Sequence, residues 1–335
     1  GYKGKYFVLG ADIAYRHAEQ EGGEYESNYT AIGNGNTFCG NFDGRGHTVS
    51  GIRIYKAGNY GSDVDQGLFG KSSGNIRGIT LADARITGYN RTGGIVGENY
   101  GTVSNCHVAA TVTIHDIQSD TWYHGGIVGI NGGTVSGCTS AATLTKPDNT
   151  DGQGYGGIAG LNDGTLRHNL AIGAVVPATN HNTYKYGAIC GMSDGGTLEN
   201  NYYHACTVAY TANATGKGCG NADVTDSNGA VPAYAMTIGD GVDFLTAMAD
   251  NLGFRYDSDG DGKAENYCPE GAKFTLNKAG YNDAEYTVTQ TADGTEITGT
   301  AIIDNVLTMP GYDITVSFSG EPIDWANDGH SGTET

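Results

Sequence analysis

The chain has 335 residues, with 56 Gly, only 6 Pro and 38% apolar residues. This length allows two domains or one long repetitive domain, and glycines without a three-residue period exclude collagen. The net charge of −19 predicts repulsion of phosphate backbones and anionic lipid, so we expect no nucleic-acid partner and no membrane insertion in this segment.

The N-terminal residues contain short apolar–polar alternations that are typical of β-strands. Residues 6–9 and 11–13 are the first two such segments. Residues 38–42 and 47–55 alternate in the same way around the turn Asp43-Gly44-Arg45-Gly46. Because terminal repeats usually differ from the others, we expect these segments to form the early, less regular coils of a repetitive fold.

A repeat organises the middle of the chain. GLFG begins at Gly67, GGIVG at Gly93 and Gly125, GGIAG at Gly156 and GAICG at Gly187. The Leu or Ile near the centre of each motif follows the previous one after 27, 32, 31 and 31 residues. A period of this size is the signature of stacked repeats.

Further columns keep the same spacing downstream of each motif. They are Asn99, Asn131, Asn162 and Ser193; Thr102, Thr134, Thr165 and Thr197; and Ile76, Val103, Val135, Leu166 and Leu198. Coils stacked one strand spacing apart, ~4.8 Å, would bury the apolar column and let Asn and Thr form hydrogen-bonded ladders at the corners. The predicted fold class is therefore all-β: a right-handed parallel β-solenoid (β-helix) with a small C-terminal β-domain.

These motifs carry a family resemblance. The segment FDGRGHTVSGIRI (Phe42 to Ile54), followed by GLFG and by the GGIVG…N…GTV…C copies, resembles the GLUG-motif family of bacterial surface proteins over about residues 1 to 210. The resemblance implies extracellular display, often beside adhesive or hydrolytic modules. It transfers no catalytic residues.

The C-terminal third has a different pattern. Residues 243–251 predict a short helix, and residues 272–319 alternate as strands and end in LTMPGYDITVSF, which is similar to the small β-repeats of internalin type. Residues 323–335 resemble the lead-in to another GLUG-type unit, or form a polar, Gly-rich tail. The predicted domains are a solenoid over 1–225, a connecting segment with a short helix and an acidic turn over 226–271, a small β-domain over 272–320, and a linker or the start of a next unit over 321–335.

Aromatic side chains precede several copies of the glycine motif. They are Trp122, Tyr123, Tyr155, Tyr184 and Tyr186. Stacked coils would place them along one edge, and exposed Trp and Tyr rings suit recognition surfaces, including the apolar faces of sugars. We predict a ligand-binding row there. The alternative is an aromatic ladder that packs on itself.

An acidic turn in the connecting segment predicts a cation site. Asp257, Asp259 and Asp261 alternate before a glycine, and Glu265 follows closely. Several carboxylates around a sharp turn suit Ca²⁺, although Cys268 stands where an EF-hand loop has its bidentate Glu. We expect no required cofactor and a candidate Ca²⁺ site here, with a solvated acidic turn as the alternative.

Catalysis is not expected from this sequence. A polysaccharide lyase or glycosidase on this fold would need paired carboxylates, about 5 to 10 Å apart for a glycosidase, and Asp163 and Asp194 occupy equivalent places in neighbouring repeats. Both Asp residues sit in turns, where Asp is favoured for its local hydrogen bonding. No metal-protease or serine-hydrolase motif is present.

The seven cysteines are expected to be structural. Cys106 and Cys138 share one repeat column, and Cys190 replaces an apolar residue in another. Cys behaves as a small, often buried hydrophobe, so an interior ladder is favoured over a disulfide or a reactive thiol.

The functional hypothesis is a non-catalytic, adhesin-like binding or display module on the bacterial cell surface. The expected partners are glycans or a host or bacterial surface protein. The alternatives are a polysaccharide-active β-helix enzyme and a purely structural stalk.

Overall fold

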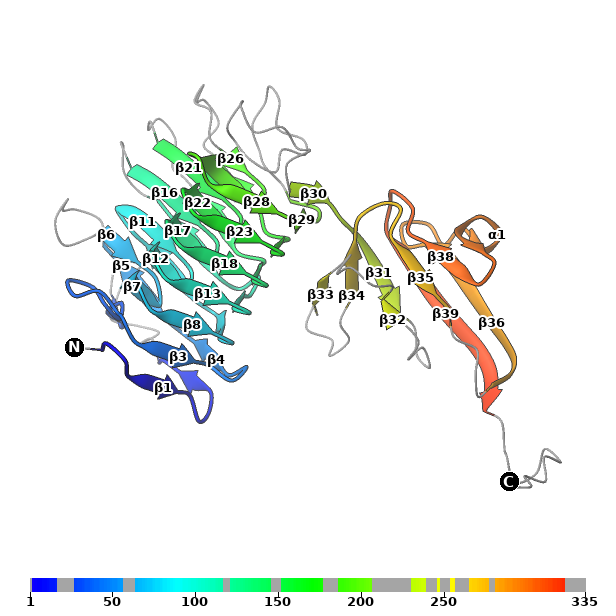
Figure 1. The fold of residues 1–335 in the computed structure, drawn as a ribbon, viewed down its shortest axis with the longest axis horizontal. Coiled ribbons are helices and arrows are strands. Elements are labelled where there is room, and N and C mark those ends of the chain that lie inside the picture. The colour runs from blue at the N-terminus through cyan, green and yellow to red at the C-terminus, as the bar shows by residue number, and fades with distance from the viewer. Residues whose placement is uncertain are drawn as a thin grey trace. The chain divides into compact units, whose positions relative to one another are not determined.

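The chain folds into two units, residues 1–232 and 233–335, which are considered separately (Figure 1). The computed structural model describes residues 2–16, 27–56, 64–116, 121–145, 152–176, 186–206, 230–238, 246–247, 254–256, 265–276 and 281–322. Strands make up nearly all of the regular structure in these ranges.

The first unit is a parallel β-solenoid. Each coil contributes one short strand to each of five sheets in turn, and equivalent strands of successive coils lie side by side in Figure 1. Five coils have all five of their strands among the described residues: β3–β7, β8–β12, β13–β17, β18–β22 and β23–β27. The predicted all-β solenoid is confirmed.

The five sheets have the following strands in spatial order. The first sheet contains β1 (Tyr6–Val8), β3 (Asn41–Asp43), β8 (Asn75–Arg77), β13 (Thr102–Ser104), β18 (Thr134–Ser136), β23 (Thr165–Arg167) and β28 (Thr197–Glu199). The second contains β2 (Ile13–Ala14), β4 (Thr48–Ser50), β9 (Thr80–Ala82), β14 (His107–Val108), β19 (Thr139–Ser140), β24 (Leu170–Ala171), β29 (Asn201–Tyr203) and β30 (Ala230–Pro232). The third contains β25 (Val175–Val176), β20 (Thr143–Thr145), β15 (Thr113–His115), β10 (Arg85–Thr87) and β5 (Arg53–Tyr55). The fourth contains β26 (Tyr186–Gly187), β21 (Gly152–Gly156), β16 (Thr121–Gly125), β11 (Asn90–Gly93) and β6 (Val64–Gln66). The fifth contains β27 (Cys190–Ser193), β22 (Ala159–Asn162), β17 (Val128–Asn131), β12 (Val96–Asn99) and β7 (Phe69–Ser72).

The repeat columns stack in register, as their spacing predicts. Thr102, Thr134, Thr165 and Thr197 pair across neighbouring strands of the first sheet. The motif residues Leu68, Ile95, Ile127, Ile158 and Ile189 are all buried in one continuous apolar core. Removal of these side chains from water supplies the main driving force for stacking the coils.

A buried asparagine ladder runs along one corner of the solenoid. The side-chain amide of Asn99 donates to Oδ1 of Asn131 at 2.9 Å, and that of Asn131 donates to Oδ1 of Asn162 at 2.9 Å. All three residues are 0% exposed. The same amides donate to backbone carbonyls of the following turn and strand, so the ladder satisfies polar groups that would otherwise be buried without partners.

The predicted burial of the repeat-column cysteines is confirmed. Cys106, Cys138 and Cys190 are 0% exposed and lie in the core. Burial raises the pKa of Cys138, and its contact with Cys106 raises it further. These thiols therefore pack as interior apolar groups.

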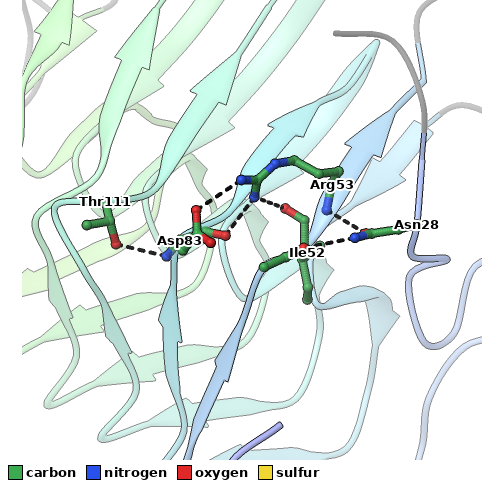
Figure 2. Close-up of polar contacts among 6 residues, drawn as sticks. Asn28, Ile52, Arg53, Asp83 and Thr111 are labelled. Atoms are coloured by element: carbon green, nitrogen blue, oxygen red, sulfur yellow. Dashed lines mark hydrogen bonds and ion pairs between the residues drawn. The ribbon is translucent and has the colours of Figure 1, made fainter. Parts of the chain in front are cut away.

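At the start of the solenoid, Asn28 covers one sheet edge with its side chain and its backbone N–H, which donates to the carbonyl of Arg53. Asn28 donates from Nδ2 to the carbonyl of Gly51 (2.9 Å) and accepts at Oδ1 from the backbone N–H of Arg53 on β5 (2.7 Å; Figure 2). The Arg53 guanidinium reaches Asp83 of the next coil, with Nη2 3.0 Å from Oδ1. Asn28 therefore closes the hydrogen bonds that β5 would otherwise leave open at the edge of the third sheet.

Replacing Asn28 should open this edge. We expect Asn28→Ala to lower the free energy of unfolding by about 1–2 kcal/mol, because two part-buried backbone groups lose their partners. Hydrogen exchange should show faster exchange at the Arg53 amide, while the Arg85 amide, bonded to the carbonyl of Ile52, serves as the internal control. Equal protection at both amides in the variant would contradict this role.

The second unit consists of two small sheets and one short helix. One sheet has the order β33 (Phe254–Tyr256), β34 (Glu265–Cys268), β31 (Tyr234–Ile238), β39 (Ile314–Pro322), β36 (Tyr281–Gln290). The other has the order β32 (Thr246–Ala247), β35 (Lys273–Thr275), β38 (Val306–Thr308), β37 (Ile302–Ile303), and α1 spans Thr298–Ala301. Its core includes Met236, Phe274, Val288, Leu307 and Val316.

Two predictions for this part of the chain are wrong. The segment 226–271 is not a separate connector, because β30 extends the solenoid to residue 232 and β31, β33 and β34 belong to the second unit. The predicted helix over 243–251 is also wrong where it is described, since Thr246–Ala247 forms β32 and pairs with β35. Strand pairing to a distant segment overrides weak local helix propensity there.

Candidate ligand-binding surface

The predicted aromatic row divides into buried and exposed members. Tyr155 and Tyr186 are 2% and 8% exposed, so their placement on an open edge is wrong. Trp122 is 41% exposed and Tyr123 is half-buried. Tyr184 lies outside the described residues.

The buried members form an interior stack. The His124 ring lies on Tyr155, and Tyr155 lies on Tyr186, with centroids 5.1 Å apart in both pairs. The Tyr155 hydroxyl donates to the carboxylate of Asp116, which is also buried. His124, Tyr155 and Tyr186 pair in register in the fourth sheet. This part of the row is therefore an aromatic ladder that packs on itself, the alternative that the sequence left open.

Tyr123 belongs to a column with left-handed backbone conformation. Asp65, Arg91, Tyr123 and Gly154 occupy equivalent places in successive strands of the fourth sheet, and all have positive φ, between 53° and 80°. A left-handed conformation costs about 1–2 kcal/mol for a residue other than Gly. The column therefore has a structural cause that outweighs this cost.

The cause lies in the last glycine of each motif copy. A Cβ on Gly97 would come within 2.5 Å of the Asp65 backbone, and a Cβ on Gly160 within 2.5 Å of the Tyr123 backbone. The fifth sheet therefore packs directly on the left-handed residues of the preceding coil. This contact explains why the motif ends in glycine.

The Tyr123 ring lies over the next coil. A Cβ on Gly154 would be 2.7 Å from Cδ1 of Tyr123, so this glycine makes room for the ring. The Trp122 ring contacts Tyr123 edge-on, with centroids 6.1 Å apart. Burial raises the pKa of Tyr123, and the charges of Asp163 and Asp194 raise it further. Gly160, which packs on the backbone of Tyr123, lies on β22, and Asp163 follows the end of that strand.

Asp163 and Asp194 occupy equivalent turns of neighbouring coils. The backbone N–H of Asp163 donates to the carbonyl of Asn131 at 2.8 Å, and that of Asp194 to the carbonyl of Asn162 at 3.0 Å. Both side chains are exposed. Partial burial of its carboxyl group raises the pKa of Asp163, and the charge of Asp194 adds to the rise.

Contacts in the second coil show that the left-handed column of the fourth sheet, the outer face of the fifth sheet and the following corner lie next to one another. Arg91 of the left-handed column lies 3.3 Å from Glu98 of the fifth sheet, and Glu98 accepts a 2.6 Å hydrogen bond from the Tyr100 hydroxyl at the corner. In the following coils the same three positions hold Tyr123, Ile130 and Gly132, then Gly154, Leu161 and Asp163. We call the set Tyr123, Ile130, Leu161, Met192, Asp163 and Asp194 the Tyr123 surface.

The first two coils close this region with ion pairs. Asp65 contacts Arg91 at 2.7 Å, and Lys71 contacts Glu98 at 2.8 Å. Burial raises the pKa of Asp65 to about 6. Burial also opposes ionisation of Glu98, but hydrogen bonds with Lys71 and Tyr100 and the nearby positive charges hold its pKa below the usual value. In the first two coils, the charged groups of Asp65, Arg91, Lys71 and Glu98 are therefore paired with one another. The Tyr123 surface instead presents apolar and acidic side chains.

The sequence signal for this surface is readable but weak. The position three residues after each motif Leu or Ile holds Lys71, Glu98, Ile130, Leu161 and Met192. This column changes from charged to apolar along the axis. The change is visible only when the repeats are aligned by column, because no aromatic residue marks these positions.

The predicted Ca²⁺ ligands are not brought together in the described part of the chain. Glu265 lies on β34, where the Tyr267 hydroxyl approaches it at 3.5 Å, and Asp257, Asp259 and Asp261 lie outside the described residues. Within the described ranges, no group of three His, Cys, Asp or Glu side chains is arranged to hold a metal ion.

Comparison with known proteins identifies the repeat. The GLUG motif matches residues 88–113, which make one circuit from the turn after β10 to the start of β15. Halomucin from Haloquadratum walsbyi (strain DSM 16790 / HBSQ001) is 33% identical over 107 residues, which cover 31% of this chain and 1% of Halomucin. No solved structure matches the chain. The GLUG resemblance is confirmed for this circuit, and the internalin-type resemblance stays a prediction.

The described residues contain no helix that is both long and apolar enough to cross a bilayer.

Proposed function

We propose that this chain is a non-catalytic, adhesin-like module of an extracellular protein on the bacterial cell surface, and that it binds glycans at the Tyr123 surface. The GLUG-motif match and the similarity to Halomucin support membership of a repetitive surface protein. The observation that carries the binding proposal is the Trp122–Tyr123 ring pair on a backbone that packs against β22, the strand that ends just before the exposed Asp163.

The chemistry of this arrangement suits a sugar. A pyranose ring has an apolar C–H face that stacks on an aromatic ring, and its edge carries hydroxyl groups that donate to carboxylates. Tyr123 supplies a half-buried ring held in place by Gly154, so little side-chain entropy remains to be lost on binding. Ile130 and Met192 are partly exposed and add apolar contact area.

The proposal is tested by glycan-array binding with the wild-type chain and a Trp122→Ala/Tyr123→Ala variant. We expect the variant to lose at least about tenfold in affinity, the effect of removing aromatic groups at the centre of a recognition site. Tyr6→Ala, at a tyrosine that is 80% exposed elsewhere on the solenoid, is the matched control and should bind as the wild type does. Equal binding by all three proteins would remove the site from this surface.

Two arms of the same experiment address the other hypotheses. Array binding with and without Ca²⁺ tests a cation at Asp257, Asp259, Asp261 and Glu265. Incubation with polysaccharides tests the enzyme alternative, for which released product would contradict a non-catalytic role. If the wild type binds no glycan, a structural stalk or a protein-binding module becomes the better account.

A further inference from the structure

We infer that the Tyr123 surface selects neutral sugar rings and rejects anionic glycans. The inference rests on the proposed function and adds the class of ligand. Two observations support this selectivity. The solenoid places two carboxylates on the side of Tyr123, and few basic side chains lie among the described residues of the same coils.

The two carboxylates are fixed on the same side of the solenoid. Asp163 and Asp194 follow Asn162 and Ser193, which pair in register in the fifth sheet. Each Asp backbone N–H is bonded to the preceding coil, so the stacking of the coils sets their spacing. Gly160 of β22 packs on the Tyr123 backbone, and Asp163 follows the end of β22. A sugar ring seated on Tyr123 would therefore have its hydroxyl edge toward Asp163 and, one coil further, Asp194.

Basic side chains are sparse among the described residues of the same coils. Between Thr102 and Ser193, the described residues contain one Lys or Arg, which is Arg167. Arg167 lies on β23 in the first sheet, beside Glu199 of β28. In the coil before the Tyr123 surface, Arg91 is held by Asp65 at 2.7 Å and by Glu98 at 3.3 Å. The described structure thus offers no unoccupied guanidinium or ammonium beside Tyr123.

These charges determine the preferred ligand. A neutral hexose or N-acetylhexosamine donates hydroxyl hydrogens to ionised carboxylates, and such charge-assisted hydrogen bonds are stronger than neutral ones. A sialic acid, uronic acid or sulfate would place a third negative charge beside Asp163 and Asp194. The net charge of −19 adds a longer-range repulsion that salt screens within about 8 Å at physiological ionic strength.

The test compares binding to immobilised neutral oligosaccharides with binding to sialylated, uronate-containing and sulfated ones in 0.15 M salt. At this ionic strength, salt screens long-range repulsion, so that direct contacts dominate the measured affinity. We expect the wild type to prefer neutral ligands by at least about tenfold. An Asp163→Asn/Asp194→Asn variant, which keeps the turn geometry that Asn also favours, should bind neutral ligands about five- to tenfold more weakly and lose its discrimination against anionic ones. Asp304→Asn, at an exposed Asp of the second unit, is the matched control and should behave as the wild type does.

The outcomes separate this inference from the proposed function. Selective binding of anionic glycans that is lost in Trp122→Ala/Tyr123→Ala would overturn the charge inference and leave the binding site in place. Neutral-glycan binding unchanged in Asp163→Asn/Asp194→Asn would also overturn it, because the carboxylates would then not contact the ligand. Absence of any glycan binding by the wild type would overturn both.

Discussion

A Gly129→Ala substitution should destabilise the solenoid by roughly 3 kcal/mol, at the upper end of the usual cost of overpacking. The new Cβ would lie 2.5 Å from the backbone carbon of Arg91 and 2.6 Å from the Thr92 nitrogen and the Gly97 oxygen. All three atoms belong to the backbone of the preceding coil, so no side chain can rotate away. The fourth and fifth sheets would have to separate locally.

The matched control is Gly10→Ala, because a Cβ on Gly10 meets no atom within 4 Å. Thermal denaturation followed by circular dichroism should show a clear fall in melting temperature for Gly129→Ala and little change for Gly10→Ala. If both variants melt together with the wild type, the close packing of the two sheets is wrong.

Breaking the asparagine ladder at its centre should have a similar or larger effect. Asn131 donates to Asn162 and to the carbonyl of Thr165, and it accepts from Asn99 and from the N–H of Gly133. Replacement by Leu leaves several of these buried groups without partners, at about 1–3 kcal/mol each. We expect Asn131→Leu to cost roughly 3–5 kcal/mol in total, in excess of any gain from burying an apolar side chain.

The ladder prediction has an exposed counterpart as its control. Asn75 also donates to an asparagine of the neighbouring coil, Asn41, at 2.7 Å, but on the solvent side of the first sheet. Asn75→Leu should change stability by no more than about 0.5 kcal/mol. Hydrogen exchange should then show lost protection in the coils around Asn131 only, since a solenoid is stabilised by contacts between neighbouring coils. Equal losses for the two variants would show that burial of the ladder does not matter.

The fold of the first unit was predictable because each coil repeats the same physical requirements. Columns such as Ile95, Ile127 and Ile158 are apolar for the same reason in every copy, and the Asn column marks the same corner. In the second unit, strand pairing joins distant segments without a repeat, so nothing local distinguishes Thr246–Ala247 from a short helix. The sequence predicts that the solenoid ends at residue 225, whereas it extends to residue 232. The difference arises because β30 joins the second sheet after the motif copies have ended.

The site was only partly predictable, for a reason of backbone geometry. The sequence predicts one exposed edge, and regular alternation would place Trp122 and His124 on the same face of the strand. The left-handed Tyr123 between them interrupts this alternation, and His124 is buried while Trp122 is exposed. Tyr123 has a left-handed conformation that its own residue type disfavours. That conformation depends on Gly160 of the next coil, so sequence preferences at position 123 do not reveal it.

The most direct test of the account is hydrogen exchange of the wild-type chain with and without the neutral oligosaccharide that it binds best. The account predicts ligand-dependent protection in residues 121–132 and 159–165, which carry Tyr123, Ile130, Leu161 and Asp163, and no such protection in the Trp122→Ala/Tyr123→Ala variant. Protection confined to the second unit, or protection that persists unchanged in the variant, would contradict a glycan site on this face of the solenoid.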